Sequence, residues 1–128
     1  MSNYTHTNMM DVENMAAGRM PGMEARFARK TIESDHLGVS FFRIDAGVRQ
    51  PFGHRHEEQE EAYLVLEGSG RLRLDDEIVD VKPWDLIRVA PQVVRAFESG
   101  DDGLAYIAIG NDRPEGGDAE MIQDFWSE

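Results

Sequence analysis

The 128-residue sequence contains no cysteine, few basic residues and no long apolar run. The lack of cysteine excludes disulfides, thiolate nucleophiles and thiolate metal sites, so any bound metal must take histidine, aspartate or glutamate ligands. No apolar stretch approaches the length that a membrane-spanning helix needs. The first residues have neither a basic start nor a continuous apolar segment, so we expect no secretory signal and a cytoplasmic protein.

Acidic residues outnumber basic residues by 25 to 13, which gives a formal net charge of −12. Such a chain repels phosphate backbones and anionic lipid surfaces, so neither nucleic acid nor a membrane is an expected partner. Hydrophobic residues make up 41% of the chain and charged residues 30%, which is the balance of an ordinary globular protein. A chain of this length is expected to form one domain around one core.

Short segments of β-like composition recur between Met23 and Gly110. About nine of them, each of about four to eight residues, are separated by turn signals such as Gly68-Ser69-Gly70 and Lys82-Pro83-Trp84-Asp85. Many short strands without helical period predict an all-β fold, either a double-sheet jelly roll or a closed barrel, because both protect strand edges. We therefore divide the chain into an N-terminal arm (1–22), a barrel (23–110) and a C-terminal tail (111–128).

The arm and the tail differ in composition from the predicted barrel. Residues 1–20 are polar, rich in methionine and without clear period, which is typical of an arm that is disordered or docked on a partner. The tail begins with flexible composition and ends with Phe125 and Trp126, two large apolar groups that are costly to leave in water. We expect these rings to dock on the barrel or on a second subunit.

The stretch HRHEEQEEAYLVLEG, residues 54–68, carries the clearest chemical signal. Side chains alternate along a strand, so His54 and His56 point the same way. Their spacing allows both Nε2 atoms to approach one metal ion at about 2.0 to 2.1 Å. Either Glu60 or Glu61 could add a carboxylate, which would complete a two-histidine, one-carboxylate triad with positions left open for water, dioxygen or substrate.

The two histidines, a glutamate and two glycines follow the pattern Gly47-x6-His54-x-His56-x4-Glu61-x6-Gly68. This pattern resembles the first signature of the cupin superfamily, with one extra residue between Gly47 and His54. The resemblance covers about residues 36–110. It implies a small single-domain cupin, with an RmlC-like jelly-roll barrel (a double-stranded β-helix), and its final spacing selects Glu61 as the third ligand.

The second cupin signature departs from the family pattern at its metal ligand. Pro83-Trp84-Asp85 stands where the family has Pro-Gly-Asp, and Arg95 stands where the family has a fourth ligand, a histidine. A guanidinium has no available lone pair and stays charged, so Arg95 cannot replace imidazole. Its charge, about 5 Å from an ion, opposes binding by roughly 3 kcal/mol at an effective dielectric of 20. We predict a weakened three-ligand site for divalent iron, manganese, nickel or zinc, and no organic cofactor.

Two interpretations of Arg95 remain open from the sequence. Beside a metal it would bind a carboxylate or enolate oxygen of a substrate, where it would stabilise developing negative charge. Without a metal it would pair with Glu61 across the cavity. Phe52, Tyr63 and Phe97 share strand parity with site residues, so we predict that with Arg95 they bind the substrate.

Acidic residues next to the motif and apolar residues on the far face of its strand suggest two further features. Glu57, Glu58 and Glu60 are expected to form an acidic rim at the cavity mouth that gathers cations and discourages highly charged anions. Ala62, Leu64 and Leu66 make the other face of the strand apolar, so this face needs cover from a second sheet or a partner, and we expect a homodimer.

Three functions are consistent with these residues. The first is a metal-dependent enzyme acting on a small organic acid or aromatic metabolite, by dioxygenation, decarboxylation or isomerisation, and its catalytic residues are not identified by the sequence. The second is a non-enzymatic, metal-free cupin in which Arg95 and Glu61 recognise a small polar or anionic metabolite. The third, a scaffold subunit, is least favoured because a scaffold has no need for two histidines in a cavity.

Overall fold

A computed structural model describes residues 3–126, which form eight strands and one short 3-10 helix. The elements are η1 (Met9–Asp11), β1 (Met23–Phe27), β2 (Gly38–Ile44), β3 (Gly53–His56), β4 (Glu61–Leu74), β5 (Glu77–Val81), β6 (Leu86–Val89), β7 (Arg95–Gly110) and β8 (Ala119–Ile122). Within this part of the chain no helix has the length and apolarity needed to cross a membrane.

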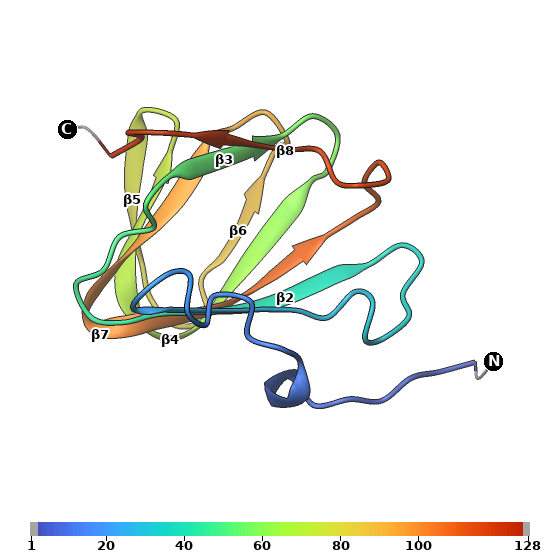
Figure 1. Cartoon of the computed structure of the whole chain (residues 1–128). Helices are drawn as coiled ribbons and strands as arrows, with labels where there is room; N and C mark the ends of the chain where they lie inside the picture. The colour runs from blue at the N-terminus through green and yellow to red at the C-terminus, as the bar shows by residue number, and fades with distance from the viewer. Residues whose placement is uncertain (1–2, 127–128) are drawn as a thin grey trace.

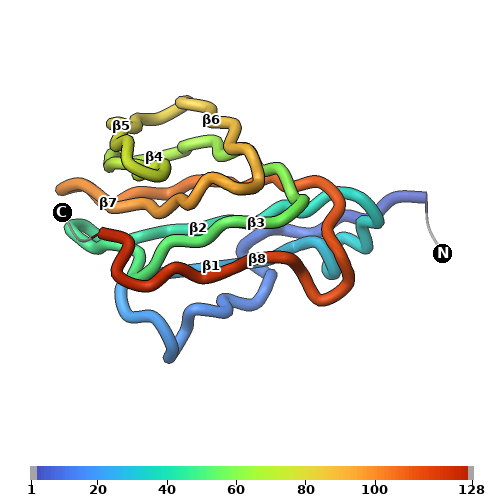
Figure 2. Tube along the Cα trace, turned by 90° about the horizontal axis from the view of Figure 1, so that it is seen from above, coloured from blue at the N-terminus to red at the C-terminus, as the bar shows by residue number. Residues whose placement is uncertain are grey.

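The strands form a jelly-roll β-barrel, which confirms the predicted fold class. Strands β1, β2, β7, β3 and β8 are neighbours in that order, while β4 pairs with β5, β6 and β7. Figure 1 shows the curled sheet, and Figure 2 shows β4, β5 and β6 as a layer on one side, with β1, β2, β3 and β8 on the other. The long strands β4 and β7 run together along most of their length and join the two layers.

Two pairs of segments that we expected as separate strands are continuous. The Gly68-Ser69-Gly70 turn signal lies inside β4, where the pairing with β7 shifts register instead of ending. Gly68 has a φ of 82°, and a Cβ there would lie 2.0 Å from the carbonyl oxygen of Gly103, so glycine is needed for the two paired strands to approach this closely. The residues from Gly100 to Gly103 likewise lie within β7. These glycines mark bulges, which bend a strand without breaking it.

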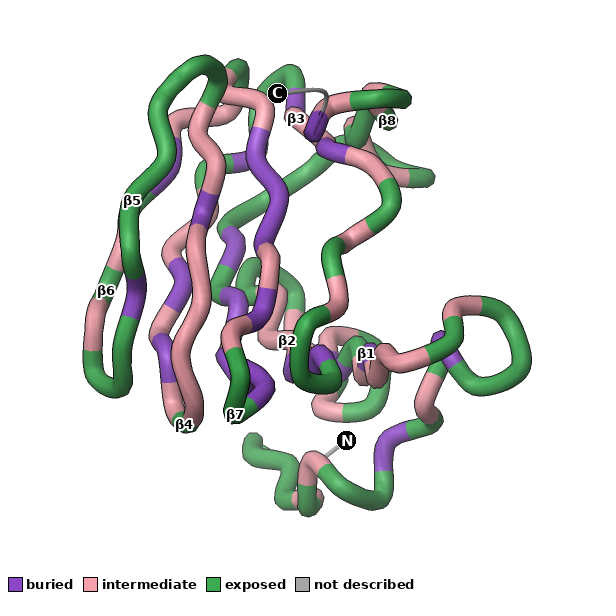
Figure 3. Tube along the Cα trace, turned by 90° about the vertical axis from the view of Figure 1, so that its left-hand side faces the viewer, coloured by how far each residue is buried: buried purple, intermediate pink, exposed green. Residues whose placement is uncertain are grey.

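The core lies between the two layers. Its buried residues include Ile44, Val65, Leu72, Phe97 and Tyr106. Figure 3 shows the buried positions as a band along the middle strands, whereas β5 and the N-terminal segment are mostly exposed. Alternation along β4 buries Tyr63 and Val65 and leaves the neighbouring Leu64 half-buried on the other face.

The N-terminal arm lies along β1. The backbone nitrogen of Met15 donates to the carbonyl of Ala25 at 2.7 Å, and the Asn14 side chain accepts from the nitrogen of Ala25 at 2.9 Å. Val12 and Ala16 are buried against the barrel. The arm therefore adds an isolated β-bridge, Asn14 to Arg26, to the edge of the sheet at β1.

The C-terminal tail packs on the chain's own barrel. Its strand β8, which the sequence did not predict, pairs antiparallel with β3. Trp126 is 8% exposed, with its ring centroid 4.7 Å from the guanidinium carbon of Arg49. A Cβ on Gly53 would lie 2.7 Å from the Phe125 ring, so the absent side chain at Gly53 makes room for that ring. The expected homodimer stays a prediction.

Candidate metal centre

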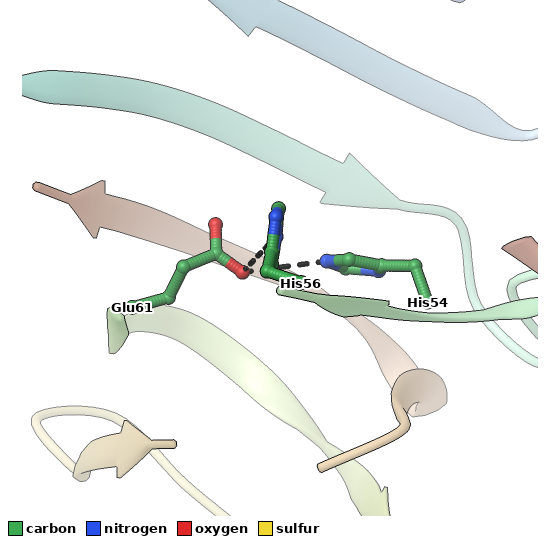
Figure 4. Close-up of side chains that lie close together, drawn as sticks. All are labelled: His54, His56 and Glu61. Atoms are coloured by element: carbon green, nitrogen blue, oxygen red, sulfur yellow. Dashed lines mark hydrogen bonds and ion pairs between the residues drawn. The ribbon is translucent and has the colours of Figure 1, made fainter. Parts of the chain in front are cut away.

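Two strands that follow each other in the chain, but do not pair with each other, bring the proposed ligands together. His54 and His56 lie two residues apart on β3, and Glu61 is the first residue of β4. Figure 4 shows the two imidazoles and the carboxylate pointing toward one another. One ligand atom from each residue lies within 4.8 Å of the other two. Glu60 faces away and its carboxylate pairs with Arg88 at 2.8 Å, so the alternation of β4 leaves Glu61 as the carboxylate beside the histidines.

Donor groups surround a single oxygen of Glu61. Its Oε1 lies 3.3 Å from His54 Nε2 and 3.2 Å from His56 Nε2, and it accepts a 2.7 Å hydrogen bond from the Tyr63 hydroxyl. Burial raises the pKa of Glu61, but hydrogen bonds from His54, His56 and Tyr63 outweigh burial and hold the pKa well below its ordinary value. Burial and the nearby Glu61 charge raise the pKa of Tyr63 well above its ordinary value. Glu61 is therefore a carboxylate and Tyr63 a phenol donor.

Asp118 contacts His56 on the side of the ring opposite the site, and the sequence did not predict this contact. Its Oδ1 lies 2.8 Å from His56 Nδ1, while Oδ2 accepts from the backbone nitrogens of Glu58 at 2.7 Å and Gln59 at 2.9 Å. Burial raises the pKa of Asp118, but the two backbone donors and His56 lower it to about 2. In the neutral imidazole, a carboxylate at Nδ1 keeps the proton on that nitrogen, so Nε2 is the atom that can ligate a metal.

The protonation of His56 depends on both carboxylates. Burial lowers its pKa, but hydrogen bonds with Glu61 and Asp118 outweigh burial and raise the pKa above its ordinary value. Arg95 opposes this rise. A metal ion would therefore compete with a proton for His56 Nε2, because only the neutral imidazole ligates.

Arg95 is fixed in the wall of the site. It is 1% exposed, its Nη1 donates to the carbonyls of Pro91 at 3.1 Å and Val93 at 2.7 Å, and its Nε donates to the Tyr63 hydroxyl at 3.2 Å. Its Nη2 lies 3.2 Å from Glu61 Oε1 as an ion pair, yet has no partner with hydrogen-bond geometry among the described residues. One buried donor of Arg95 is thus directed at the site with its hydrogen-bonding capacity unused.

The residues present fit a divalent transition metal. Two imidazole Nε2 atoms and one carboxylate converge, and Asp118 fixes one imidazole in the ligating tautomer, which is the arrangement found around metal-bound histidines. Arg95 Nη2 lies 3.2 Å from the Glu61 carboxylate, so its positive charge would lower the affinity of these three ligands for a metal ion.

A cavity of about 570 Å³ opens beside these residues. Phe52, Tyr63 and Phe97 line it, as do His54, His56, Glu61 and Arg95. Tyr106, which strand parity alone did not select, also lines it, stacked on Phe97 with a centroid distance of 4.1 Å. Trp84, the aromatic residue of the Pro83-Trp84-Asp85 segment, is 75% exposed and does not line the cavity.

The prediction of an acidic rim at the cavity mouth is wrong. Glu57, Glu58 and Glu60 do not line the cavity, and Glu61 is the acidic residue among the described residues that do. The charged lining is instead mainly basic, with Arg19, Arg29 and Arg113 in addition to Arg95. Local sequence charge did not predict this, because these arginines come from segments distant in sequence from the motif.

Comparison with known proteins agrees with the fold and the motif. The family model described as "Cupin domain" matches residues 40–110. The chain belongs to the cupin family. A segment of 46 residues is 39% identical to the uncharacterized protein MJ1618 of Methanocaldococcus jannaschii, and covers 36% of this chain and 37% of that protein. This cupin therefore matches little more than a third of that relative's length.

Solved structures share the architecture of this cupin. A cupin protein of Bacteroides fragilis, BF4112, is 23% identical, with a TM-score of 0.73 over 89% of this chain and 88% of that chain. The polyketide cyclase RemF of Streptomyces resistomycificus is also 23% identical, with a TM-score of 0.73 over 97% of this chain and 87% of that chain. These likenesses establish the fold, and the chemistry of this cupin must be argued from its own residues.

Proposed function

We propose that this cupin is a metal-dependent enzyme that acts on a small organic acid or aromatic metabolite, with a divalent transition metal held by His54, His56 and Glu61. The observation that carries the proposal is the convergence of these three ligands, with His56 fixed by Asp118, at a cavity of about 570 Å³. A volume of this size suits a small organic molecule. The type of reaction, whether dioxygenation, decarboxylation or isomerisation, is left open by the proposal.

The residues around the ligands have distinct tasks in this proposal. When bound, the metal would supply a Lewis acid that polarises an oxygen of the substrate. Arg95 Nη2, buried and without a hydrogen-bond partner among the described residues, would bind and orient an anionic oxygen of the substrate. The Tyr63 hydroxyl keeps its proton and donates a hydrogen bond to Glu61 Oε1, which fixes the carboxylate in place. The aromatic wall would exclude water from the reacting atoms.

Metal analysis with a matched control tests this proposal. Chelator-treated protein is reconstituted separately with iron, manganese, nickel and zinc, dialysed and measured for bound metal, beside His56→Ala and His36→Ala. His36 is exposed and its Nδ1 contacts Asp112 at 2.9 Å, outside the cavity. We expect retention of at least one metal by the wild type and by His36→Ala, and its loss in His56→Ala. Failure to retain any of the four metals would refute the proposal.

The ion pair between Arg95 and Glu61 supports a second candidate function. Because Arg95 Nη2 lies 3.2 Å from Glu61 Oε1, the two residues would together recognise a small polar or anionic metabolite in a non-enzymatic cupin. Thermal melting of chelator-treated protein separates the two functions. Stabilisation by small carboxylates and none by metals favours the binding protein, whereas stabilisation by a metal before any carboxylate favours the enzyme.

A further inference from the structure

We infer that the substrate is an amphipathic organic anion, with an apolar body inside the cavity and a negatively charged group held at the mouth by Arg19, Arg29 and Arg113. This inference rests on the proposed function, because it takes the cavity beside the ligands as the substrate site. It adds a second anchoring point, separate from Arg95, and so a substrate long enough to reach from the ligands to the mouth.

The ion pairs of the molecule single out these arginines. Nine of the thirteen basic residues have an acidic partner within ion-pair distance: Arg26, Arg43, Arg49, Arg55, Arg71, Arg73, Lys82, Arg88 and Arg95. Arg19, Arg29, Lys30 and Arg113 have none among the described residues. Three of these four line the cavity. With 25 acidic residues in the chain, a shortage of carboxylates does not explain this gathering.

Three separate segments bring the arginines to one opening. Arg19 belongs to the arm, Arg29 to the loop between β1 and β2, and Arg113 to the loop between β7 and β8. Arg29 Nη2 donates to the carbonyl of Asn111 at 2.9 Å, which ties its loop to the loop that carries Arg113. Arg19 and Arg113 are exposed and Arg29 is half-buried, so they mark the open end, whereas Arg95 lies at the closed end.

Much of the remaining cavity lining is apolar and adaptable. Met15, Met20, Met23, Phe27 and Phe42 line the cavity together with the arginines. Methionine side chains are flexible and adjust to apolar groups of different shape. The cavity thus combines an apolar lining with cationic groups, Arg95 among the proposed ligands and the three arginines at the mouth. This lining is complementary to an elongated acid and not to a small, uniformly polar sugar.

The sign of the charge at the mouth is opposite to that of the whole protein. The chain carries a formal net charge of −12, which would repel anions from most of its surface. The arginines at the opening, which have no acidic partner in the part of the chain that the structure describes, make the local potential positive and draw an anion toward the cavity. Guanidinium groups also bind carboxylates and sulfonates through paired hydrogen bonds, which a lysine cannot offer.

Binding of a matched pair of probes tests the inference. The anion 4-(1-naphthyl)butanoate and the neutral alcohol 4-(1-naphthyl)butan-1-ol share an apolar body and are titrated calorimetrically into chelator-treated protein. We expect the anion to bind about tenfold more tightly than the alcohol, and this preference to shrink at high salt because the mouth is exposed. The double variant Arg19→Gln/Arg113→Gln should lose the preference, whereas Lys30→Gln should keep it, because Lys30 lies outside the cavity and has no acidic partner among residues 3–126.

The double variant leaves Arg29 unchanged because its hydrogen bond to Asn111 joins two loops. Equal binding of the two probes to the wild type would overturn the inference, as would an undiminished preference for the anion in the double variant, since Arg95 alone would then hold the anion. The probes are measured without metal, so a preference that depends on Arg19 and Arg113 stands even if the metal analysis above fails.

Discussion

The contact between Asp118 and His56 predicts a loss of metal affinity when a single carboxylate oxygen is replaced. Asp118 satisfies three donors: His56 Nδ1 at 2.8 Å and the backbone nitrogens of Glu58 at 2.7 Å and Gln59 at 2.9 Å. In Asp118→Asn one oxygen remains. If it keeps the backbone donors, the amide NH2 faces His56 Nδ1 and favours the tautomer with the proton on Nε2, which removes the lone pair that would ligate.

The magnitude follows from the role of such partners. Loss of the carboxylate behind a metal-bound histidine typically costs 10- to 100-fold in affinity, or about 1.4 to 2.7 kcal/mol. We expect this loss for Asp118→Asn, measured by zinc competition with a chromophoric chelator at pH 7.5. Asp112→Asn is the matched control, because Asp112 lies in the same loop but contacts the exposed His36. Wild-type zinc affinity in Asp118→Asn, with the fold intact by circular dichroism, would refute the reasoning.

Three other predictions concern the fourth-ligand position, the apo protein and the tail. Arg95→His should raise zinc affinity about tenfold or more, because it removes a buried positive charge and restores a ligand; unchanged affinity in the same competition assay would show that this residue does not act on the site. In chelator-treated protein, the raised pKa of His56 contributes stability that is fully present below its unfolded value of about 6.5 and is lost as pH rises through the folded value. The melting temperature of the wild type should therefore fall from pH 6 to pH 8 by more than that of His56→Gln, and parallel curves would contradict the shift. Gly53→Ala places a Cβ 2.7 Å from the Phe125 ring and should cost about 1 to 3 kcal/mol of unfolding free energy in urea; wild-type stability would mean that the ring does not pack there.

The fold and the cluster of His54, His56 and Glu61 were accessible from the sequence because strand periodicity and the resemblance to the cupin signature are both local patterns. A period of two fixes the common face of His54 and His56, and the resemblance to the cupin signature implies Glu61 rather than Glu60. Turn signals located the breaks between most strands. They failed at Gly68, because a glycine that allows close approach of two paired strands looks the same in sequence as one that ends a strand.

The parts of the site that the sequence did not reveal come from distant segments. Asp118 is 62 residues from His56, and no motif links them. Arg19 and Arg113 reach the cavity from the arm and from the loop before β8, whereas the acidic residues near the motif face outward, as Glu60 does toward Arg88. Tertiary pairing, which local pattern does not encode, decides these placements.

The most direct test of the metal centre is anomalous scattering from crystals grown without chelator, measured at the absorption edges of iron, manganese, nickel and zinc. We predict an anomalous peak between His54 Nε2, His56 Nε2 and the Glu61 carboxylate, and its absence in crystals of His56→Ala. No peak at this position at any of the four edges, with Arg95 and Glu61 still paired in the refined structure, would contradict the proposed metal centre.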